Sequence, residues 1–496
     1  VSLEGVTIPD EVFNLIPERI AGKQKVVVFE RTPQAIKVAT SQPENTDITK
    51  LLAQKTGTAV QIHYTTDSSI NKLLRAYKKD LQKSVDNLLK EGIWDSVSAA
   101  TDDPPVARIV NLLIETAYQE RSSDIHIEPY ESDALARFRI DGILHDVLRV
   151  PKYLHERIIT RIKVLSNLRT DEHLSAQDGK MKIPLEAENL DVRVSILPIV
   201  DGEKAVLRLL ASRLSSYSFG NLGMNEVDLA KVTNAFNQSY GMILSTGPTG
   251  SGKTTSIYSI LKILNTRERN ITTIEDPVEY RIQGANQIHV NPKTNLTFAH
   301  GLRAILRQDP NVIFVGEIRD SETAGIAVNA ALTGHLVVST LHTNDASTAI
   351  PRLIDMNVEP YLVASTVNII VAQRLVRQIC GDCKEKSTVE KDKLLKNFPE
   401  SIIKKILGSE KSLSSYHGKG CSQCRNTGYV GRIGIFEVLA ISTGIRKLII
   451  DKADADVIAT AASREGMKTM LEDGLEKVSS GMTTLEEILR VTKSES

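Results

Sequence analysis

A glycine-rich run near the middle of the chain has the residue types and spacing of a phosphate-binding loop. The pattern G-x-x-x-x-G-K-[ST] is met at every position by Gly247, Pro248, Thr249, Gly250, Ser251, Gly252, Lys253 and Thr254, with Thr255 next in line. Glycine lets the backbone approach phosphate oxygens, so that successive N–H groups point at them. Lys253 can reach the β- and γ-phosphates of a nucleotide, and the Thr254 hydroxyl can hold Mg²⁺. We therefore predict that this loop binds a nucleoside triphosphate with magnesium.

The segments on either side of this loop are those that a phosphate loop needs. Residues 242–244 predict a short buried strand, and residues 255–264 predict a helix. The loop would then lie at a helix N-terminus, where unpaired N–H groups and the helix dipole favour anions. A glycine-rich turn that fits the pattern by chance is the alternative, and the strand and helix argue against it.

Nucleotide hydrolysis requires carboxylates in addition to a phosphate loop, because magnesium must be held and water must be oriented. Residues 312–317 predict an apolar strand that ends in Glu317. Gly316 stands where the usual acidic pair of such a strand would begin. Magnesium coordination would then depend on Thr254, on water molecules and on Glu317.

A second acidic cluster follows another predicted strand. Glu275, Asp276 and Glu279 come directly after the β-rich run at residues 271–273. In an open α/β sheet, ligands bind at the carboxyl ends of the strands, so we expect these carboxylates to lie near the nucleotide. A polar turn around Pro277 is the alternative.

Two histidines, His335 and His342, stand at the two ends of one apolar run. Residues seven apart in a strand point to opposite faces, so the pair is not expected to share a metal ion. Sensing of the γ-phosphate, or a link from it to a subunit contact, fits better. A structural hydrogen-bonding role for either histidine stays open.

All four cysteines lie in two C-x-x-C pairs, Cys380 with Cys383 and Cys421 with Cys424, which 37 residues separate. Each pair can offer two thiolates to one ion, and four thiolates make a closed, structural Zn²⁺ site. The long intervening span allows an inserted helical segment, such as residues 391–407. Two disulfides are the alternative, although so few cysteines are typical of a reducing compartment.

The composition limits the classes of function. The chain has 496 residues, 61 of them basic and 61 acidic, so no net charge draws it to nucleic acid or to a membrane surface. A locally charged patch on the surface is still compatible with this composition. No apolar run approaches the roughly 18 residues of a membrane-spanning helix, and no secretory signal is evident. We expect a cytoplasmic protein with no transmembrane segment and no direct contact with nucleic acid. Because residue 1 is Val, we expect the natural chain to begin earlier.

The length predicts three or four domains. In order, we predict an N-terminal α/β docking domain (1–80), a polar linker (81–103), a second α/β domain (104–223), a nucleotide-binding domain (226–375), a cysteine module (376–435) and a helical C-terminal region (436–496). The second domain ends in a Ser/Gly-rich hinge at 212–223. It places Arg193 and Arg208 in the middle of strands, where a single arginine is most often on a solvated face.

In the first domain, β-rich runs at 26–29 and 36–39 predict strands. Residues 48–54 and 70–77 carry apolar residues at helical spacing. None of these segments carries evident chemistry, so a plain packed domain is as compatible with them as a docking module.

The motifs together resemble the secretion-superfamily ATPases of type II secretion and type IV pilus assembly. The segments that carry the resemblance are, in order, 249–255, 274–280, 316–320 and 340–344. It extends to 124–128, 138–142 and 177–179. It is strong over about residues 100–440 and weak over the first 80 residues.

The resemblance implies an α/β, multidomain fold with a RecA-like core preceded by a PAS-like domain. It implies a homo-hexamer that hydrolyses ATP with Mg²⁺ and passes domain motion to an inner-membrane platform protein, which holds the chain at the membrane. Glu279 would activate the attacking water, and Glu317 would hold the metal shell. Glu275 belongs to the same acidic box as Glu279. His335 and His342 would read the nucleotide state.

The resemblance also implies arginines that the preceding domain supplies across a subunit interface. The matching positions are Arg193 and Arg208, with Arg139 nearby, and such an arginine stabilises charge that develops on the phosphates. Lys180 stands where the family usually has arginine, and lysine cannot make a bidentate contact. The zinc-bearing module docks to a membrane partner in assembly and secretion ATPases and is missing from retraction ATPases, which favours export or extension.

Two other functions stay open at this point. A nucleic-acid translocase could use the same core, although zero net charge and the lack of aromatic-basic stretches count against it. A nucleotide-controlled scaffold that does not hydrolyse ATP is opposed by Glu279, Glu317 and the arginines. Pilus assembly and type II secretion are not separated by the sequence.

Overall fold

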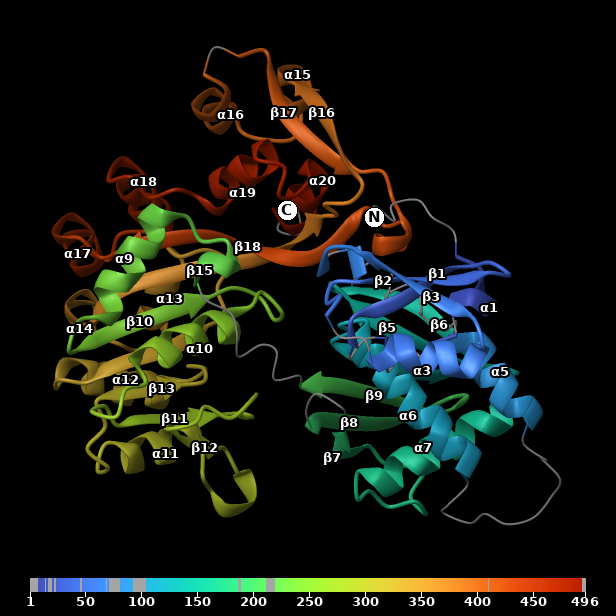
Figure 1. The fold of residues 1–496 in the computed structure, drawn as a ribbon. Coiled ribbons are helices and arrows are strands. Elements are labelled where there is room, and N and C mark those ends of the chain that lie inside the picture. Colours follow the sequence, from blue (N-terminus) through green and yellow to red (C-terminus); the bar gives the residue numbers. More distant parts are fainter. Residues whose placement is uncertain are drawn as a thin grey trace.

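Figure 1 shows two large groups of elements side by side, with a smaller group projecting at the top. The computed structural model describes residues 8–13, 15–16, 20–21, 24–44, 47–67, 69–70, 81–91, 104–185, 189–210, 219–408 and 410–492. Most of the helix predicted at 70–77, the later part of the predicted linker and most of the predicted hinge lie outside the described residues.

The N-terminal domain contains a three-stranded sheet in the order β1-β2-β3. Its described strands and principal helices are β1 (Val26–Arg31), β2 (Ala35–Thr40), β3 (Ala59–Tyr64), α1 (Asp10–Phe13) and α3 (Asp47–Thr56). Strands β2 and β3 are parallel, and α3 forms the crossover between them. The sequence predicts β1, β2 and α3 but misses β3, a short strand in which no side chain is buried.

A helix lies where the sequence predicts a linker. Helix α5 (Leu81–Glu91) occupies the start of the range 81–103, so the linker prediction is wrong for these residues. Leu81 and Val85 are buried in the core of the second domain, beside α6 (Pro104–Gln119). The error has a physical cause: the charged residues of this segment form the exposed face of an amphipathic helix.

The second domain is an antiparallel sheet in the order β6-β5-β4-β9-β8-β7, with helices on one face. Its elements besides α6 are β4 (Asp124–Pro129), β5 (Asp133–Ile140), β6 (Ile143–Pro151), α7 (Lys152–Leu165), β7 (Gln177–Pro184), β8 (Asn189–Ile199) and β9 (Gly202–Leu210). Along β8, Val192 and Val194 face the helices and are buried, so Arg193 between them faces the opposite side.

The nucleotide-binding domain is built on a seven-stranded sheet in the order β12-β11-β13-β14-β10-β15-β18. Its strands are β10 (Gly241–Thr246), β11 (Ile271–Glu275), β12 (Asn286–His289), β13 (Val312–Val315), β14 (Leu336–Leu341), β15 (Val367–Ile379) and β18 (Tyr429–Ala440). All neighbours pair in parallel except β15 and β18.

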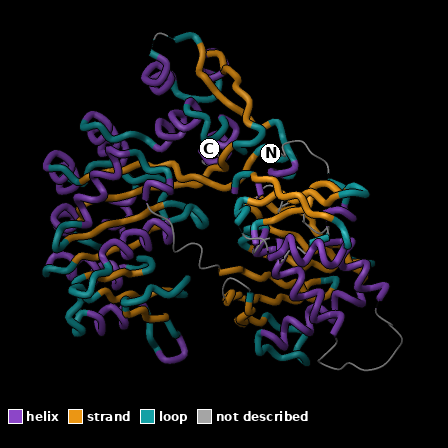
Figure 2. The backbone as a smooth tube through the Cα atoms, viewed as in Figure 1, coloured by secondary structure: helices purple, strands orange, loops and turns teal. Residues whose placement is uncertain are grey.

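Helices cover both faces of this sheet (Figures 1 and 2). They are α8 (Phe219–Leu222), α9 (Glu226–Phe236), α10 (Lys253–Leu264), α11 (Phe298–Ile305), α12 (Ser321–Leu332), α13 (Ala349–Asp355) and α14 (Pro360–Thr366), and a short turn of 3₁₀ helix forms η3 (Pro292–Thr294). Met242 and Leu244 belong to one buried cluster and Ile243 to another. A parallel sheet that is buried on both faces explains why these strands read as continuous apolar runs.

The cysteine module is an insertion between two adjacent strands of this sheet. It holds β16 (Lys384–Glu390), α15 (Lys391–Leu395), α16 (Glu400–Leu407), β17 (Ser412–Gly418) and η4 (Ser422–Cys424). The boundaries predicted at 375 and 435 are therefore wrong, because β15 runs to Ile379 and β18 runs to Ala440 within one sheet. The module is the projection at the top of Figure 1.

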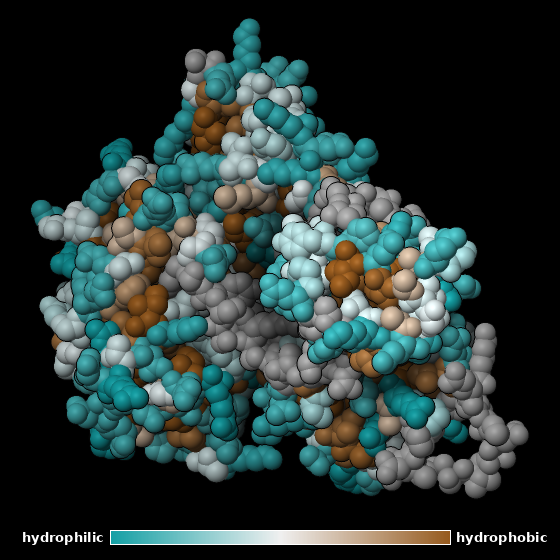
Figure 3. Space-filling model, viewed as in Figure 1, coloured by the Kyte–Doolittle hydropathy of each residue, from teal (hydrophilic) through white to brown (hydrophobic). Residues whose placement is uncertain are grey.

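Four helices follow the last strand: α17 (Thr443–Ile450), α18 (Ala455–Arg464), α19 (Met470–Ser479) and α20 (Leu485–Thr492). Their apolar residues join the cluster on one face of the central sheet. Within the described parts of the chain, no helix is long and apolar enough to cross a bilayer. The face drawn in Figure 3 is mostly hydrophilic, with apolar residues in separate patches.

Candidate functional site

The phosphate loop connects the last residue of β10, Thr246, to the first residue of α10, Lys253. Gly247 has a φ angle of 143°, and a Cβ atom there would lie 2.5 Å from the carbonyl oxygen of Gln373. Gly252 precedes the helix with a φ angle of 90°. Both positions therefore require glycine. The loop N–H groups and the first turn of α10, with Thr254 and Thr255, form the expected anion-binding end of a helix.

Lys253 folds back onto the loop that precedes it. Its ammonium donates hydrogen bonds to the carbonyl oxygens of Gly247 (2.6 Å) and Pro248 (3.0 Å). Burial lowers the pKa of Lys253 to about 8, against the opposing attraction of Glu317. The ammonium is thus desolvated and held by neutral carbonyls, an arrangement in which a phosphate would be a much stronger partner.

A glutamine that the sequence motifs do not mark supports the loop from the neighbouring strand. The Gln373 side-chain amide donates to the carbonyl oxygen of Ser251 at 2.9 Å, and Gln373 is buried in β15. Because β15 pairs with β10, this side chain lies beside the loop although it is far away in sequence. The only available signal would have been knowledge of the strand order.

Glu317 lies beside the loop, as the sequence predicts for the acid that ends β13. One carboxylate oxygen is 2.7 Å from Arg319 Nη2, and the other is 3.1 Å from His342 Nε2. Its charge also acts on Lys253. Glu317, Arg319 and His342 thus lie together at the carboxyl edge of the parallel sheet, where the phosphate loop begins and where ligands of such folds bind.

The structure separates the two histidines. His342 directly follows β14, at the edge that carries the loop. His335 directly precedes β14, and its carbonyl oxygen accepts a hydrogen bond from Gly241 N at the start of β10. A six-residue strand lies between the histidines, so His335 is about 20 Å away, at the opposite edge. Its Nδ1 atom lies 3.1 Å from the carbonyl oxygen of Ala330 at the end of α12. Of these two histidines, His342 is the one that lies at the sheet edge with the phosphate loop.

The two glutamates of the acidic box differ in their surroundings. Glu275 ends β11, is 3% exposed and accepts hydrogen bonds from Thr273 and Tyr258. Burial raises the pKa of Glu275, and these hydrogen bonds oppose the rise. Glu279 lies on the loop beyond it, with its side chain one-third exposed at 33%. Of these two glutamates, Glu279 is therefore the one that can meet water.

Arg193 of the second domain reaches this same loop. Its Nη1 atom is 3.3 Å from a carboxylate oxygen of Glu279, and its Nη2 atom donates to the Val278 carbonyl oxygen at 2.7 Å. These contacts lie within one chain, whereas the sequence led us to expect a contact across a subunit interface. Arg208 pairs with Arg193 in register but is held by Asp124 of its own domain, at 3.1 Å.

A row of basic side chains crosses the sheet face that carries these arginines. Cross-strand register places the following residues in line: Arg139, Asp124, Arg208, Arg193 and Lys180. Arg139 Nε is 3.7 Å from the buried Asp124 carboxylate, so this single acid lies between two of the arginines. The row thus presents more positive charge than its own domain neutralises.

These features can be compared with known proteins. A family model described as "Type II/IV secretion system protein" matches residues 99–490. The chain belongs to this family. A model described as "MshEN domain" matches residues 1–83. The predicted resemblance is confirmed, and the chain is an ATPase of the family that includes pilus-assembly and type II secretion ATPases.

Relatives match this ATPase over nearly its whole length. The type IV pilus assembly ATPase PilB of Myxococcus xanthus is 38% identical, over 99% of this chain and 88% of that protein. The type II secretion system protein E of Pectobacterium carotovorum is 40% identical, over 98% of each. A crystal structure of the pilus retraction motor PilT with bound ADP is 27% identical, with a TM-score of 0.53 over 77% of this chain and 96% of that one. The predicted α/β fold is confirmed.

The four cysteines of this ATPase lie together. Their sulfur atoms are all within 4.8 Å of one another, and three Sγ–Sγ distances are 3.7–3.8 Å. A disulfide would need about 2.05 Å, so the cysteines are free thiols that can hold one metal ion. Backbone N–H groups of Gly420, Cys421 and Gly428 point at the sulfurs, at 3.1–3.3 Å. Such donors stabilise thiolates around a metal.

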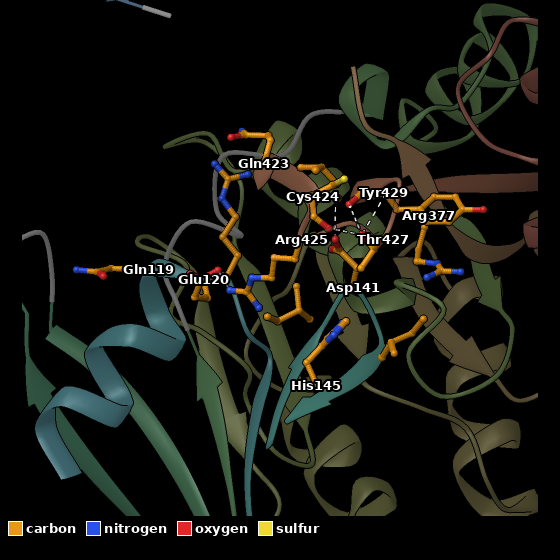
Figure 4. Close-up of a pocket in the computed structure, with 15 residues that line it drawn as sticks. Gln119, Glu120, Asp141, His145, Arg377, Gln423, Cys424, Arg425, Thr427 and Tyr429 are labelled. Atoms are coloured by element: carbon orange, nitrogen blue, oxygen red, sulfur yellow. Dashed lines mark hydrogen bonds and ion pairs between the residues drawn. The ribbon is translucent and has the colours of Figure 1, made fainter. Parts of the chain in front are cut away.

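A cavity of about 240 Å³ is lined by Cys424 and its neighbours on one side and by residues of the second domain on the other (Figure 4). In β18 of the central sheet, Gly431 N donates to an Asp141 carboxylate oxygen at 2.8 Å. Arg425, next to Cys424, forms an ion pair with Glu120 at the end of α6. The insertion therefore contacts both the core and the domain that carries the arginines.

The low pKa of Lys253 predicts a pH dependence of nucleotide binding. Only the charged ammonium attracts phosphate, and a group whose pKa is about 8 loses its charge as the pH rises. The dissociation constant of a fluorescent ATP analogue should therefore rise about fivefold between pH 8 and pH 9. Equilibrium titration of the assembled protein checks this.

Lys253→Arg is the matched control, because arginine keeps its charge over this range. Its dissociation constant, whatever its absolute value, should vary less than twofold between the same pH values. A flat profile in the parent protein would contradict the prediction.

Proposed function

We propose that this ATPase is a hexameric motor that hydrolyses MgATP to drive type IV pilus assembly or type II protein secretion. It would work on the cytoplasmic side of the inner membrane, through a membrane platform protein. Relatives that match over most of their length, one from type IV pilus assembly and one from type II secretion, support the proposal. The observation that carries it is the meeting of the phosphate loop with Glu317 at one sheet edge, while Arg193 of another domain contacts Glu279.

In the proposed site, Lys253 and the loop N–H groups bind the triphosphate. Thr254 and Glu317 hold Mg²⁺, partly through water, because Gly316 leaves the strand end with a single acid. Glu279 activates the attacking water, for which its exposed carboxylate is better placed than that of Glu275.

Arg193 would neutralise charge on the phosphates once nucleotide displaces its present contacts. Its pairing with Glu279 is partly exposed, so the ion pair itself is worth at most about 1 kcal/mol and can be broken readily. Because Arg193 already reaches the acidic box of its own chain, we propose that it serves that chain's nucleotide. Arg208 lies next to it and would add a second positive charge.

The first test removes the Lys253 ammonium, which would bind phosphate, and the Glu279 carboxylate, which would activate water. Lys253→Ala and Glu279→Gln should each lower the ATP turnover of the assembled protein at least 100-fold, because each removes an interaction with the reacting phosphate or water. Glu279→Gln should still bind ATP, whereas Lys253→Ala should not. Steady-state phosphate release and analogue binding measure these effects. Lys262→Ala, on the last turn of the same helix, is the control and should turn over like the parent. Parental turnover in Lys253→Ala would refute the site.

A mixing experiment tests which chain Arg193 serves. Lys253→Ala chains supply intact arginines, and Arg193→Ala chains supply intact phosphate loops. If Arg193 acts within its own chain, rings mixed from the two inactive variants should show no more turnover than the separate variants combined. Recovery of a substantial part of parental turnover on mixing would show that the arginine crosses a subunit interface.

We propose that the cysteines hold zinc. Zn–S bonds of about 2.3 Å in a tetrahedron place sulfur atoms about 3.8 Å apart, and three of the Sγ–Sγ distances are 3.7–3.8 Å. Four thiolates leave no open coordination position, so the ion would stabilise the module without taking part in the reaction. Supported in this way, the module could dock to the membrane partner.

Metal analysis tests this assignment. The purified protein should contain about one zinc ion per chain, and Cys383→Ser should lose most of it and melt several degrees lower, because metal binding contributes to folding. Gln423→Ala, which changes a residue between two of the cysteines and keeps every sulfur, should retain the metal. A parent protein with no zinc and fewer than four titratable thiols would contradict the assignment.

A further inference from the structure

A single buried hydroxyl joins the helix of the phosphate loop to both glutamates of the acidic box. Tyr258 lies on α10 and is only 2% exposed. Its hydroxyl donates to a carboxylate oxygen of Glu275 and accepts a hydrogen bond from the backbone N–H of Glu279 at 3.3 Å. The phosphate-loop helix is thus connected, through one oxygen atom, to the chain segment that carries Glu279.

The ring of Tyr258 is fixed by its neighbours. It packs edge-to-face against Tyr280, with 4.3 Å between the ring centres, and against Phe314 of β13, with 6.1 Å. Edge-to-face pairs are favourable and restrict the ring's orientation. The ring contacts therefore fix the direction of the Tyr258 hydroxyl. A phenylalanine at position 258 would keep these ring contacts and lose the oxygen atom.

Both oxygen atoms of the Glu275 carboxylate accept hydrogen bonds. One oxygen accepts from Tyr258, and the other accepts from Thr273 Oγ1 at 2.6 Å and from Gln287 Nε2 at 3.2 Å. Since the side chain is also buried, it has no free face for a water molecule or a magnesium ion. The sequence placed Glu275 among the catalytic residues; the geometry points to a supporting role.

We infer that Tyr258, anchored by Glu275, is a positioning residue that sets where Glu279 stands relative to the phosphate loop. The inference rests on the proposed function, in which Glu279 activates water. Glu279 lies on a loop beyond the end of β11, so its place depends on whatever fixes that loop. A displacement of about 1 Å in such a group can cost about 100-fold in rate.

Tyr258→Phe tests the hydroxyl. We expect the kcat for ATP to fall about 10- to 100-fold, while KM and the affinity for an ATP analogue stay within about twofold, because the binding groups are untouched. Tyr280→Phe is the matched control, since it removes a hydroxyl from the neighbouring ring of the same cluster, and it should keep kcat within about twofold. Parental turnover in Tyr258→Phe would overturn the inference, as would an equal loss in both variants.

A second series separates positioning from direct catalysis at Glu275. Glutamine keeps an oxygen that can accept from Tyr258, and the Thr273 hydroxyl can turn to accept from its amide group. Gln287 stays held by Ile282 N and the Tyr280 carbonyl oxygen, so only its contact with residue 275 is lost. Glu275→Gln should therefore retain kcat within about fivefold, whereas Glu275→Ala should lose about 100-fold. If Glu275 acted on water itself, both variants would be equally inactive. This series does not depend on how well Tyr258→Phe folds, and analogue binding confirms that each variant has an intact loop.

Glu279→Gln distinguishes failure of the inference from failure of the proposed function. An inactive Glu279→Gln beside a fully active Tyr258→Phe would refute the positioning role alone. An active Glu279→Gln would remove the proposed role of Glu279 and the inference with it. The expected result is a kcat order of parent, Glu275→Gln, Tyr258→Phe and Glu279→Gln, from high to low.

Discussion

The parallel pairing of β10 with its neighbour β14 is the constraint on which the nucleotide site depends. Its register sets Thr246 opposite Leu341, so both strands end at the same level and the phosphate loop begins beside the segment with His342. The two chain segments are then locked, since Thr246 Oγ1 donates to the Thr343 carbonyl oxygen at 2.8 Å and accepts from Thr343 N at 3.0 Å. The next strand is tied in the same way, with Ile318 N donating to the Thr340 carbonyl oxygen at 3.0 Å. Residues from three parts of the sequence therefore meet around one loop.

The second domain meets this edge with a sheet whose two faces differ. Its helices bury one face, and the alternation of side chains leaves the arginines on the other. Only one buried acid, Asp124, lies in the basic row, and it holds Arg208 and Arg139. Arg193 instead forms an ion pair with Glu279 of the acidic box. The row therefore keeps an excess of positive charge beside the acidic box.

Local patterns could predict much of this arrangement. The phosphate loop, the strand that ends in Glu317 and the cysteine pairs are encoded in short stretches, because their chemistry needs fixed spacings. Residues that meet only through strand order could not be read in this way. Gln373 supports the loop from a strand more than a hundred residues away, and β18 returns to the sheet after the whole cysteine insertion. His335 was assigned to the nucleotide because it belongs to a motif, and the strand direction takes it to the opposite edge. The burial of Glu275 could not be predicted either, because a run of acidic residues does not show which carboxylate turns into the core.

The place of the insertion fits a structural role for its four-cysteine cluster. Its described sheet has only two strands, and such a hairpin is marginal in water without further support. Cys380 directly follows β15, and Cys424 lies shortly before β18, so an ion held by the cluster would clamp the two strands where the insertion leaves and rejoins the sheet. The backbone pairing of Cys380 N with the Gly428 carbonyl oxygen, at 2.9 Å, continues the ladder between these strands. Strand β15 also carries Gln373, which holds the phosphate loop. One continuous strand thus joins the cysteine module to the residue that supports the phosphate loop, and its position in the sheet is fixed on both sides, by β10 and by β18.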